Sequence, residues 1–214
     1  MHKRKITTDV PSVDRELSAL QLDREMLLEV VKFGDRQRAL CSSNHPKGFD
    51  LVEMNAWTAR GLRDQFCSQK WVKSEHKNQP GIENPELKVR VVPCNFDQHC
   101  GSLSRDPTNV SIKGSASKKN AICNGTGWLF DPDPYSKIDN ESGFNTWILG
   151  TYFCRDSFKL YAELSFPDGF ENGQYTTYAH RIILMSGFDP SAELKIDDGR
   201  DGPTDFVDIP VLRK

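Results

Sequence analysis

The sequence lacks several features that would place it in a well-defined class. No apolar run approaches the ~20 residues that a membrane span requires. No apolar stretch follows the basic start, Met1 to Lys5, as it would in a secretory signal peptide. The sequence also has no CxxC zinc knuckle, G-x-S-x-G elbow, P-loop or EF-hand ligand series. We therefore expect an intracellular, cytoplasmic protein whose functional residues are dispersed along the chain.

The composition is that of a globular protein rather than a disulfide-stapled one. Hydrophobic residues make up 37% of the 214 residues and charged residues 27%. A chain of this length can bury a core without disulfide cross-links, so the six cysteines are expected to be free thiols. We expect a flexible basic arm and short helix over residues 1–20, and a single domain over residues 21–214.

The stretch 146–187 is the densest in aromatic and β-branched residues and predicts three strands. Residues 159–166 alternate between apolar and polar, which is the period of a half-buried strand. The expected breaks are at 155–157 and 167–169, with the Asn172-Gly173 turn signal shortly after. Short connections between neighbouring strands favour antiparallel pairing.

Two amphipathic helices are predicted before this sheet. Apolar residues recur at helical spacing over residues 22–40, and a second helix is expected over 51–70. A helix-turn-helix motif is disfavoured, because about ten residues separate the helices where that motif has three or four. The predicted fold class is α+β, with a helical part (21–80) packed on a mainly antiparallel or mixed sheet (85–214).

The remaining elements are predicted less clearly by pattern. A strand is expected over 87–92, ended by Pro93, and another over 121–130, broken by two glycines. The small, polar and basic residues 113–119 predict a mobile loop that wraps an anion. Residues 206–212 predict a short edge strand after a turn cluster at 197–202.

An uneven distribution of charge suggests an anionic partner. Residues 1–125 carry a net charge of +5 and residues 126–214 a net charge of −7. Clustered cations interleaved with aromatics favour phosphate contacts, so nucleic-acid binding is the leading prediction, although a solvated face would have the same pattern. The cations proposed for this role are Arg60, Arg63, Lys70, Lys73, Lys113, Lys118 and Lys119, with Lys77 continuing the basic stretch.

The enzymatic form of this prediction is a Mg²⁺-dependent nuclease acting on DNA. Such sites need carboxylates on or beside strands to hold the metal, and often a lysine to position water. Asp133, Asp156 and Glu163 are the candidate metal ligands, and Lys159 is the candidate assisting residue. The match to the PD-(D/E)xK pattern is incomplete, because Glu163 is followed by Leu-Ser and not by X-Lys.

Two alternatives stay open at the level of sequence. A zinc site could be built from Cys94, His99, Cys100 and Cys123, although their spacing is unusual and buried thiols are the simpler interpretation. A non-catalytic protein–protein interaction module could instead use the acidic second half. A homodimer or another protein partner would be compatible with either hypothesis.

Overall fold

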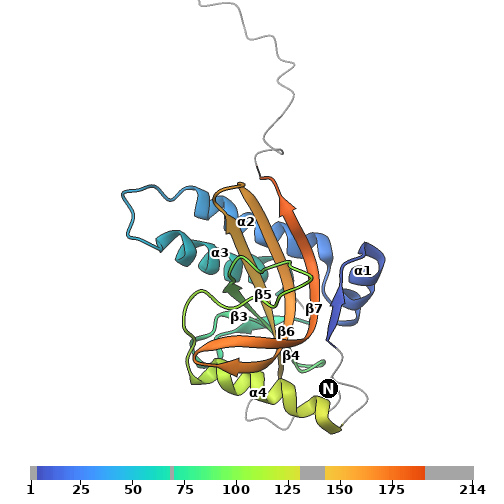
Figure 1. The fold of residues 1–214 in the computed structure, drawn as a ribbon. Coiled ribbons are helices and arrows are strands. Elements are labelled where there is room, and N and C mark those ends of the chain that lie inside the picture. The colour runs from blue at the N-terminus through green and yellow to red at the C-terminus, as the bar shows by residue number, and fades with distance from the viewer. Residues whose placement is uncertain (1–3, 68–69, 131–142, 191–214) are drawn as a thin grey trace, which may run out of the picture.

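The computed structural model describes residues 4–67, 70–130 and 143–190. It confirms the α+β class: helices and a seven-stranded mixed sheet in the order β1-β7-β6-β5-β4-β3-β2 (Figure 1). The helices are α1 (Val10–Ala19), α2 (Arg24–Ala39), α3 (Phe49–Phe66) and α4 (Ser115–Phe130), with a short 3₁₀ turn, η1 (His76–Asn78). The strands are β1 (Lys5–Thr7), β2 (Val72–Ser74), β3 (Gly81–Asn84), β4 (Val89–Asn95), β5 (Asn145–Cys154), β6 (Lys159–Glu171) and β7 (Gln174–Phe188).

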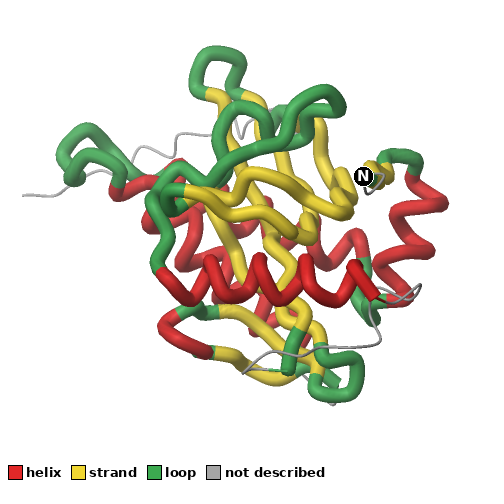
Figure 2. Tube along the Cα trace, turned by 60° about the horizontal axis from the view of Figure 1, so that its bottom comes forward, coloured by secondary structure: helices red, strands yellow, loops and turns green. Residues whose placement is uncertain are grey.

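The sheet separates two apolar layers. One core cluster joins α1, α2 and α3 to one face of the sheet, where Trp147 and Leu164 are fully buried. A smaller cluster lies on the opposite face, where Ala121 of α4 and Phe96 of the segment after β4 pack against Ile148 and Tyr178. The helix α4 therefore covers the face that the N-terminal helices leave open (Figure 2). No helix in the described part of the chain is long and apolar enough to cross a membrane.

The two predicted N-terminal helices are confirmed, with shifted ends: α2 is shorter than 22–40 at both ends, and α3 begins before residue 51. Leu27, Val30, Val31 and Gly34 of α2 are buried at the spacing of one helical face. Asp23 caps this helix, since its side chain accepts a hydrogen bond from the backbone N of Met26 at 2.9 Å. The second helix, α3, ends at Phe66 and not at residue 70, because Cys67 has an extended backbone.

The three central strands are also confirmed, but one predicted turn is wrong. The chain reverses at 155–158 as expected. β6 then continues through Pro167 and Gly169 to Glu171, and register shifts against β7 absorb these two residues as bulges. The second reversal lies at Asn172-Gly173, where both residues have positive φ (50° and 81°).

Pairing between distant segments changes the remaining predictions. β4 passes through Pro93 to Asn95 because it pairs in parallel with β5 over its whole length. The strand expected at 121–130 and the mobile loop expected at 113–119 are wrong, because α4 begins at Ser115 and runs to Phe130. Part of the expected basic arm forms β1, which pairs in parallel with β7. The edge strand predicted at 206–212 lies outside the described residues.

Candidate functional site

Glu163, the central residue of the predicted metal site, is fully buried on β6. Its carboxylate accepts hydrogen bonds from Ser165 Oγ at 2.6 Å and from the backbone N of Gly101 at 2.7 Å. Arg181 of β7 completes the set, with Nε 2.8 Å from Oε1 and Nη2 paired to Oε2. Both carboxylate oxygens are therefore occupied by protein donors in this structure.

Arg181 extends this network into the segment that follows β4. Its Nη1 donates to the backbone oxygens of Ser102 at 2.8 Å and Arg105 at 2.9 Å. The side chain is fully buried, so its charge depends on Glu163 and on Asp106, 3.4 Å away. The buried pair thus fastens the segment 96–110 to the sheet, which is a structural role.

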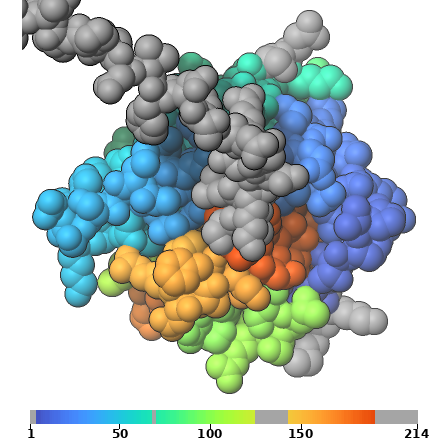
Figure 3. Space-filling model, turned by 90° about the horizontal axis from the view of Figure 1, so that it is seen from above, coloured from blue at the N-terminus to red at the C-terminus, as the bar shows by residue number. Residues whose placement is uncertain are grey.

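The other residues of the predicted nuclease site do not join Glu163. Asp156 lies in the turn between β5 and β6 and lines the same hollow as Arg38 and Asp50. This end of the central strands, light orange in Figure 3, is on the face shown there. Lys159 is exposed at the start of β6, about 13 Å along the strand from Glu163. Asp133 lies outside the described residues. Within the described ranges, no group of three or more His, Cys, Asp or Glu side chains could hold a metal ion.

Of the three cysteines considered for zinc, two pack as core residues, whereas Cys123 is half-buried on α4. Cys94 and Cys100 are buried in the core cluster beneath α4. The Cys100 thiol lies 3.7 Å from the backbone oxygen of Gly150, to which it donates. Burial, followed by the nearby charge of Glu163, raises the pKa of Cys100 well above its usual value. Because zinc binds the thiolate, this environment disfavours ligation by Cys100.

The cations predicted on α3 are engaged within the fold. Arg63 is half-buried and donates to the backbone oxygens of Ser74 at 2.8 Å and Gly81 at 3.3 Å. It therefore ties the end of α3 to β2 and β3. Arg60 is exposed, pairs with Asp64 at 3.2 Å and lies over the Trp57 ring.

Two further predicted cations lie at the β2 edge of the sheet. Lys70 and Lys73 are exposed near β2. Lys73 pairs in register with Ile82, whose side chain belongs to the core that faces the N-terminal helices. Since side chains at paired positions share a face, Lys73 lies on the helix α3 side of the edge strand.

The structure gathers the remaining predicted cations at the start of α4. Lys113 precedes this helix, and Lys118 and Lys119 are exposed in its first turns. Lys77 of η1 lines the same hollow as Lys113, although the two are 36 residues apart in sequence. We call Lys77, Lys113, Lys118 and Lys119 the α4 basic surface.

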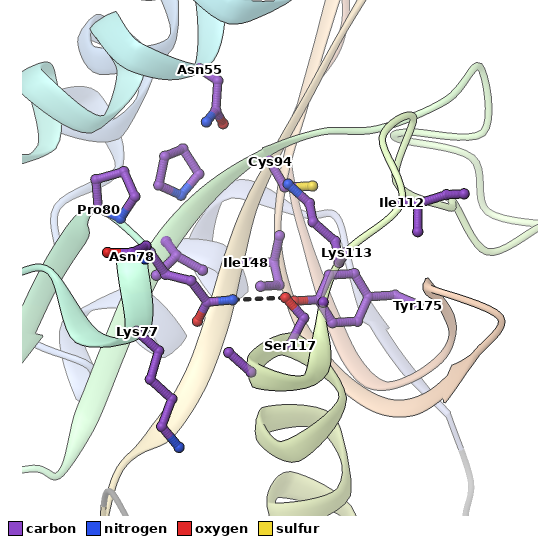
Figure 4. A pocket seen from close by; sticks show the side chains of 15 residues that line it. Asn55, Lys77, Asn78, Pro80, Cys94, Ile112, Lys113, Ser117, Ile148 and Tyr175 are labelled. Atoms are coloured by element: carbon purple, nitrogen blue, oxygen red, sulfur yellow. Dashed lines mark hydrogen bonds between the residues drawn. The ribbon is translucent and has the colours of Figure 1, made fainter.

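A hydrogen-bonded bridge holds the two segments of this surface together. Nε2 of Gln79 donates to Ser117 Oγ at 2.7 Å, and Oε1 of the same side chain accepts from Asn120 Nδ2 at 2.9 Å. Because Gln79 follows η1 and its partners lie on successive turns of α4, this single side chain sets the distance between them. Figure 4 shows Ser117 at one side of the hollow, where a dashed line marks this hydrogen bond.

The hollow itself has a volume of about 260 Å³ and is lined by both apolar and polar side chains. Val92, Pro93 and Ile148 contribute apolar surface from β4 and β5. Asn55 points into the space from α3, while Lys113 reaches toward Cys94 from the opposite side (Figure 4). We call this hollow the α4 pocket. Sequence patterns do not indicate it, because they place Asn55 on a helix without showing which element that helix face meets.

The chain matches no protein-family model, no curated protein and no solved structure.

Proposed function

We propose that this protein binds nucleic acid, with the phosphate backbone lying on the α4 basic surface. The observation that carries this proposal is that Lys77 and Lys113, which are distant in sequence, line one hollow beside the start of α4, where Lys118 and Lys119 are exposed. Lys118 lines a second hollow that shares Lys113 with the α4 pocket, so the cations follow a continuous path. A row of lysines along a groove is the arrangement that tracks a phosphate backbone.

The start of α4 adds to the positive potential of this surface. The first N–H groups of a helix have no partner within the helix and carry part of its dipole. Lys118 N is bonded to the backbone oxygen of Gly114, which leaves the N–H groups of the preceding turn directed toward the end of the helix. Anions are commonly bound at such a helix start. Here it supports the lysines in attracting phosphate.

The catalytic form of the hypothesis stays a prediction. The Mg²⁺-dependent nuclease requires Glu163 to release Arg181 or Asp133 to recruit other ligands, and the geometry of the described residues favours neither. The protein–protein interaction module also stays a prediction. Many of the acidic residues behind it lie in 131–142 and 191–214, outside the described residues.

Charge reversal at two sites tests the binding proposal. The double variant K118E/K119E should weaken binding of a short DNA or RNA strand, on the order of tenfold or more at 0.1 M salt, because phosphate contacts become repulsions. The slope of log K against log salt should also become shallower by roughly 0.7–0.9 per lost contact. Fluorescence anisotropy over a salt series measures both quantities.

The matched control is K70E/K73E, which reverses two exposed lysines near β2, of which Lys73 lies on the α3 side of the sheet. It changes the net charge by the same amount but should leave most of the affinity intact. Equal losses in both double variants would show that only overall charge matters and would overturn the proposed surface. Absence of binding to DNA and RNA at low salt would overturn the function.

A further inference from the structure

We propose that this chain's own segment 205–212 docks in an apolar groove on the α2 side of the sheet. The groove lies between the second half of α2 and the adjoining ends of β5, β6 and β7 (Figure 1), and we call it the α2 groove. It shares no lining residue with the α4 pocket. Docking there is therefore independent of the proposed binding of nucleic acid.

The lining of the α2 groove is apolar and partly open to solvent. Phe153, Leu160 and Phe188 line it from three neighbouring strands, and its volume is about 650 Å³. Leu40, which follows α2, is 73% exposed, and Phe158 in the turn between β5 and β6 is 66% exposed. Large apolar side chains gathered around one groove, rather than scattered singly, are typical of a surface that another segment covers.

Phe158 has a backbone conformation that its exposed position does not explain. Its φ of 54° lies in the left-handed region, which is unfavourable for a bulky side chain. Glycine or asparagine would form the same turn with less strain. The ring lies edge-on to Phe153, with 6.3 Å between the ring centroids, and both rings line the α2 groove. Burial of the exposed ring beneath another segment would offset the strain.

The charged residues of the α2 groove indicate the chemistry of its occupant. Lys32, Arg36 and Arg38 line the groove, against the two carboxylates of Asp35 and Asp189. Lys32 and Arg38 lie over aromatic rings of the lining, at 4.8 and 3.5 Å from the ring centroids. A segment that combines apolar side chains with carboxylates would therefore match both the apolar lining and its cations.

The segment 205–212 has this composition and is attached close to the groove. It reads Asp-Phe-Val-Asp-Ile-Pro-Val-Leu, which places two carboxylates among apolar side chains. Pro190, the last described residue before it, itself lines the α2 groove. The residues between Pro190 and Asp205 span up to roughly 50 Å when extended, at about 3.3–3.6 Å each. The turn signals at 197–202 favour a reversal of the chain between them.

This attachment favours the chain's own segment over a second copy or another protein. A tethered segment meets its site at an effective concentration on the order of millimolar. A free partner at about micromolar concentration would need an affinity roughly a thousandfold higher to reach the same occupancy. The attached segment therefore occupies the groove even where its intrinsic affinity is weak.

Photo-crosslinking in the full chain identifies the occupant. Replacing Phe158 by p-benzoylphenylalanine puts a photoreactive ketone at the α2 groove, and the control carries it in place of Val72, which is exposed on the edge strand β2. Mass spectrometry should map links from position 158 to peptides of the segment 205–212 within one chain, and none from position 72. Links between two chains, links to other segments, equal links from both positions or no links would overturn the proposal.

A matched pair of variants gives a second measurement. Phe206→Asp puts a charge among the apolar side chains of the segment, so it should weaken docking about tenfold or more, the worth of one buried phenylalanine. The cross-link yield should fall, and fluorescence of the apolar dye ANS should rise as the groove opens. Thr204→Asp adds the same charge just before the segment and should change neither readout. Identical results for the two variants would also overturn the proposal.

Discussion

At the scale of single residues, Glu163 and Asp64 show how burial changes the role of a carboxylate. Glu163 has no exposed surface and pairs with an equally buried Arg181. The side chain of Asp64 is 58% exposed and pairs with an exposed Arg60. The first pair lies where water cannot replace a lost partner, whereas the second lies where water can. The sequence contains both residues without indicating this difference.

Glu163→Gln should therefore destabilise the protein strongly. The change keeps the shape of the side chain but leaves Asp106, 3.4 Å away, as the remaining counter-charge of the buried Arg181, so the free energy of unfolding should fall by about 3–5 kcal/mol. Urea denaturation followed by circular dichroism measures it. The same chemical change in Asp64→Asn should cost below about 1 kcal/mol. Similar losses in the two variants would contradict the structural role given to the Glu163–Arg181 pair.

His180 should make stability depend on pH in a defined window. Burial lowers its pKa from 6.5 to about 4, although the carboxylate of Glu16, 2.8 Å from Nε2, opposes this effect. The unfolded chain therefore binds one more proton than the folded chain between these two values. Stability from this group is complete above pH 6.5 and is lost as the pH falls toward 4.

Between pH 7.5 and 5, the wild-type protein should lose roughly 2 kcal/mol more of its unfolding free energy than His180→Gln does, since the variant cannot titrate there. The titration of Glu16 does not interfere with this comparison. Burial by itself would raise its pKa, but hydrogen bonds from Lys5 and Thr7 outweigh burial and lower the pKa below 4.5. The contribution of the Glu16 carboxylate to stability is thus lost at a lower pH. Urea titrations at the two pH values decide the matter, and parallel losses in both proteins would refute the prediction.

At the scale of elements, the contact between β5 and the segment after β4 depends on one missing side chain. Gly150 lies opposite Phe96, and a Cβ atom at position 150 would come within 2.1 Å of the Phe96 ring. In the sequence, Gly150 looks like a weak point in an otherwise strong strand. In the structure it is the place where an aromatic ring packs directly on the strand, which a larger residue would prevent.

Gly150→Ala should displace Phe96 and loosen the segment 96–110. We expect the free energy of unfolding to fall by about 1–3 kcal/mol, the usual cost of overpacking a core. Gly114→Ala is the matched control, because a Cβ atom at that position meets nothing within 4 Å. Thermal unfolding compares the two variants, and a Gly150→Ala protein as stable as the control would disprove this account of the contact.

Local patterns predicted some elements better than others for a physical reason. α2 and α3 could be foreseen because each buries one continuous apolar face, which leaves a helical period in the sequence. α4 could not, because its first turns are small and polar and its buried positions include Ser117, Asn120 and Asn124. These side chains bond to Gln79 and to backbone oxygens of the sheet, so partners distant in sequence stabilise this helix.

At the scale of the whole molecule, the mixed sheet determines which charges meet. The parallel pair β4–β5 requires a long connection, and α4 is part of it. This crossover carries Lys113, Lys118 and Lys119 to one face of the sheet, and Lys113 lines the same hollow as Lys77 of η1. The cations of α3 remain with the other layer. The predicted cations are thus divided between two surfaces, and the one at α4 includes Lys77 and Lys113 of the α4 pocket.

The sequence by itself determined the α+β class, the two N-terminal helices and the three central strands, because each leaves its own period or turn signal in neighbouring residues. It also marked Lys113, Lys118 and Lys119 as cations suited to phosphate. Only the tertiary structure decided that Glu163 is occupied by Arg181, that Asn55 faces a pocket and that Lys77 lies beside α4. These features arise from contacts between residues far apart in the sequence. Such contacts leave no pattern in neighbouring residues from which they could be predicted.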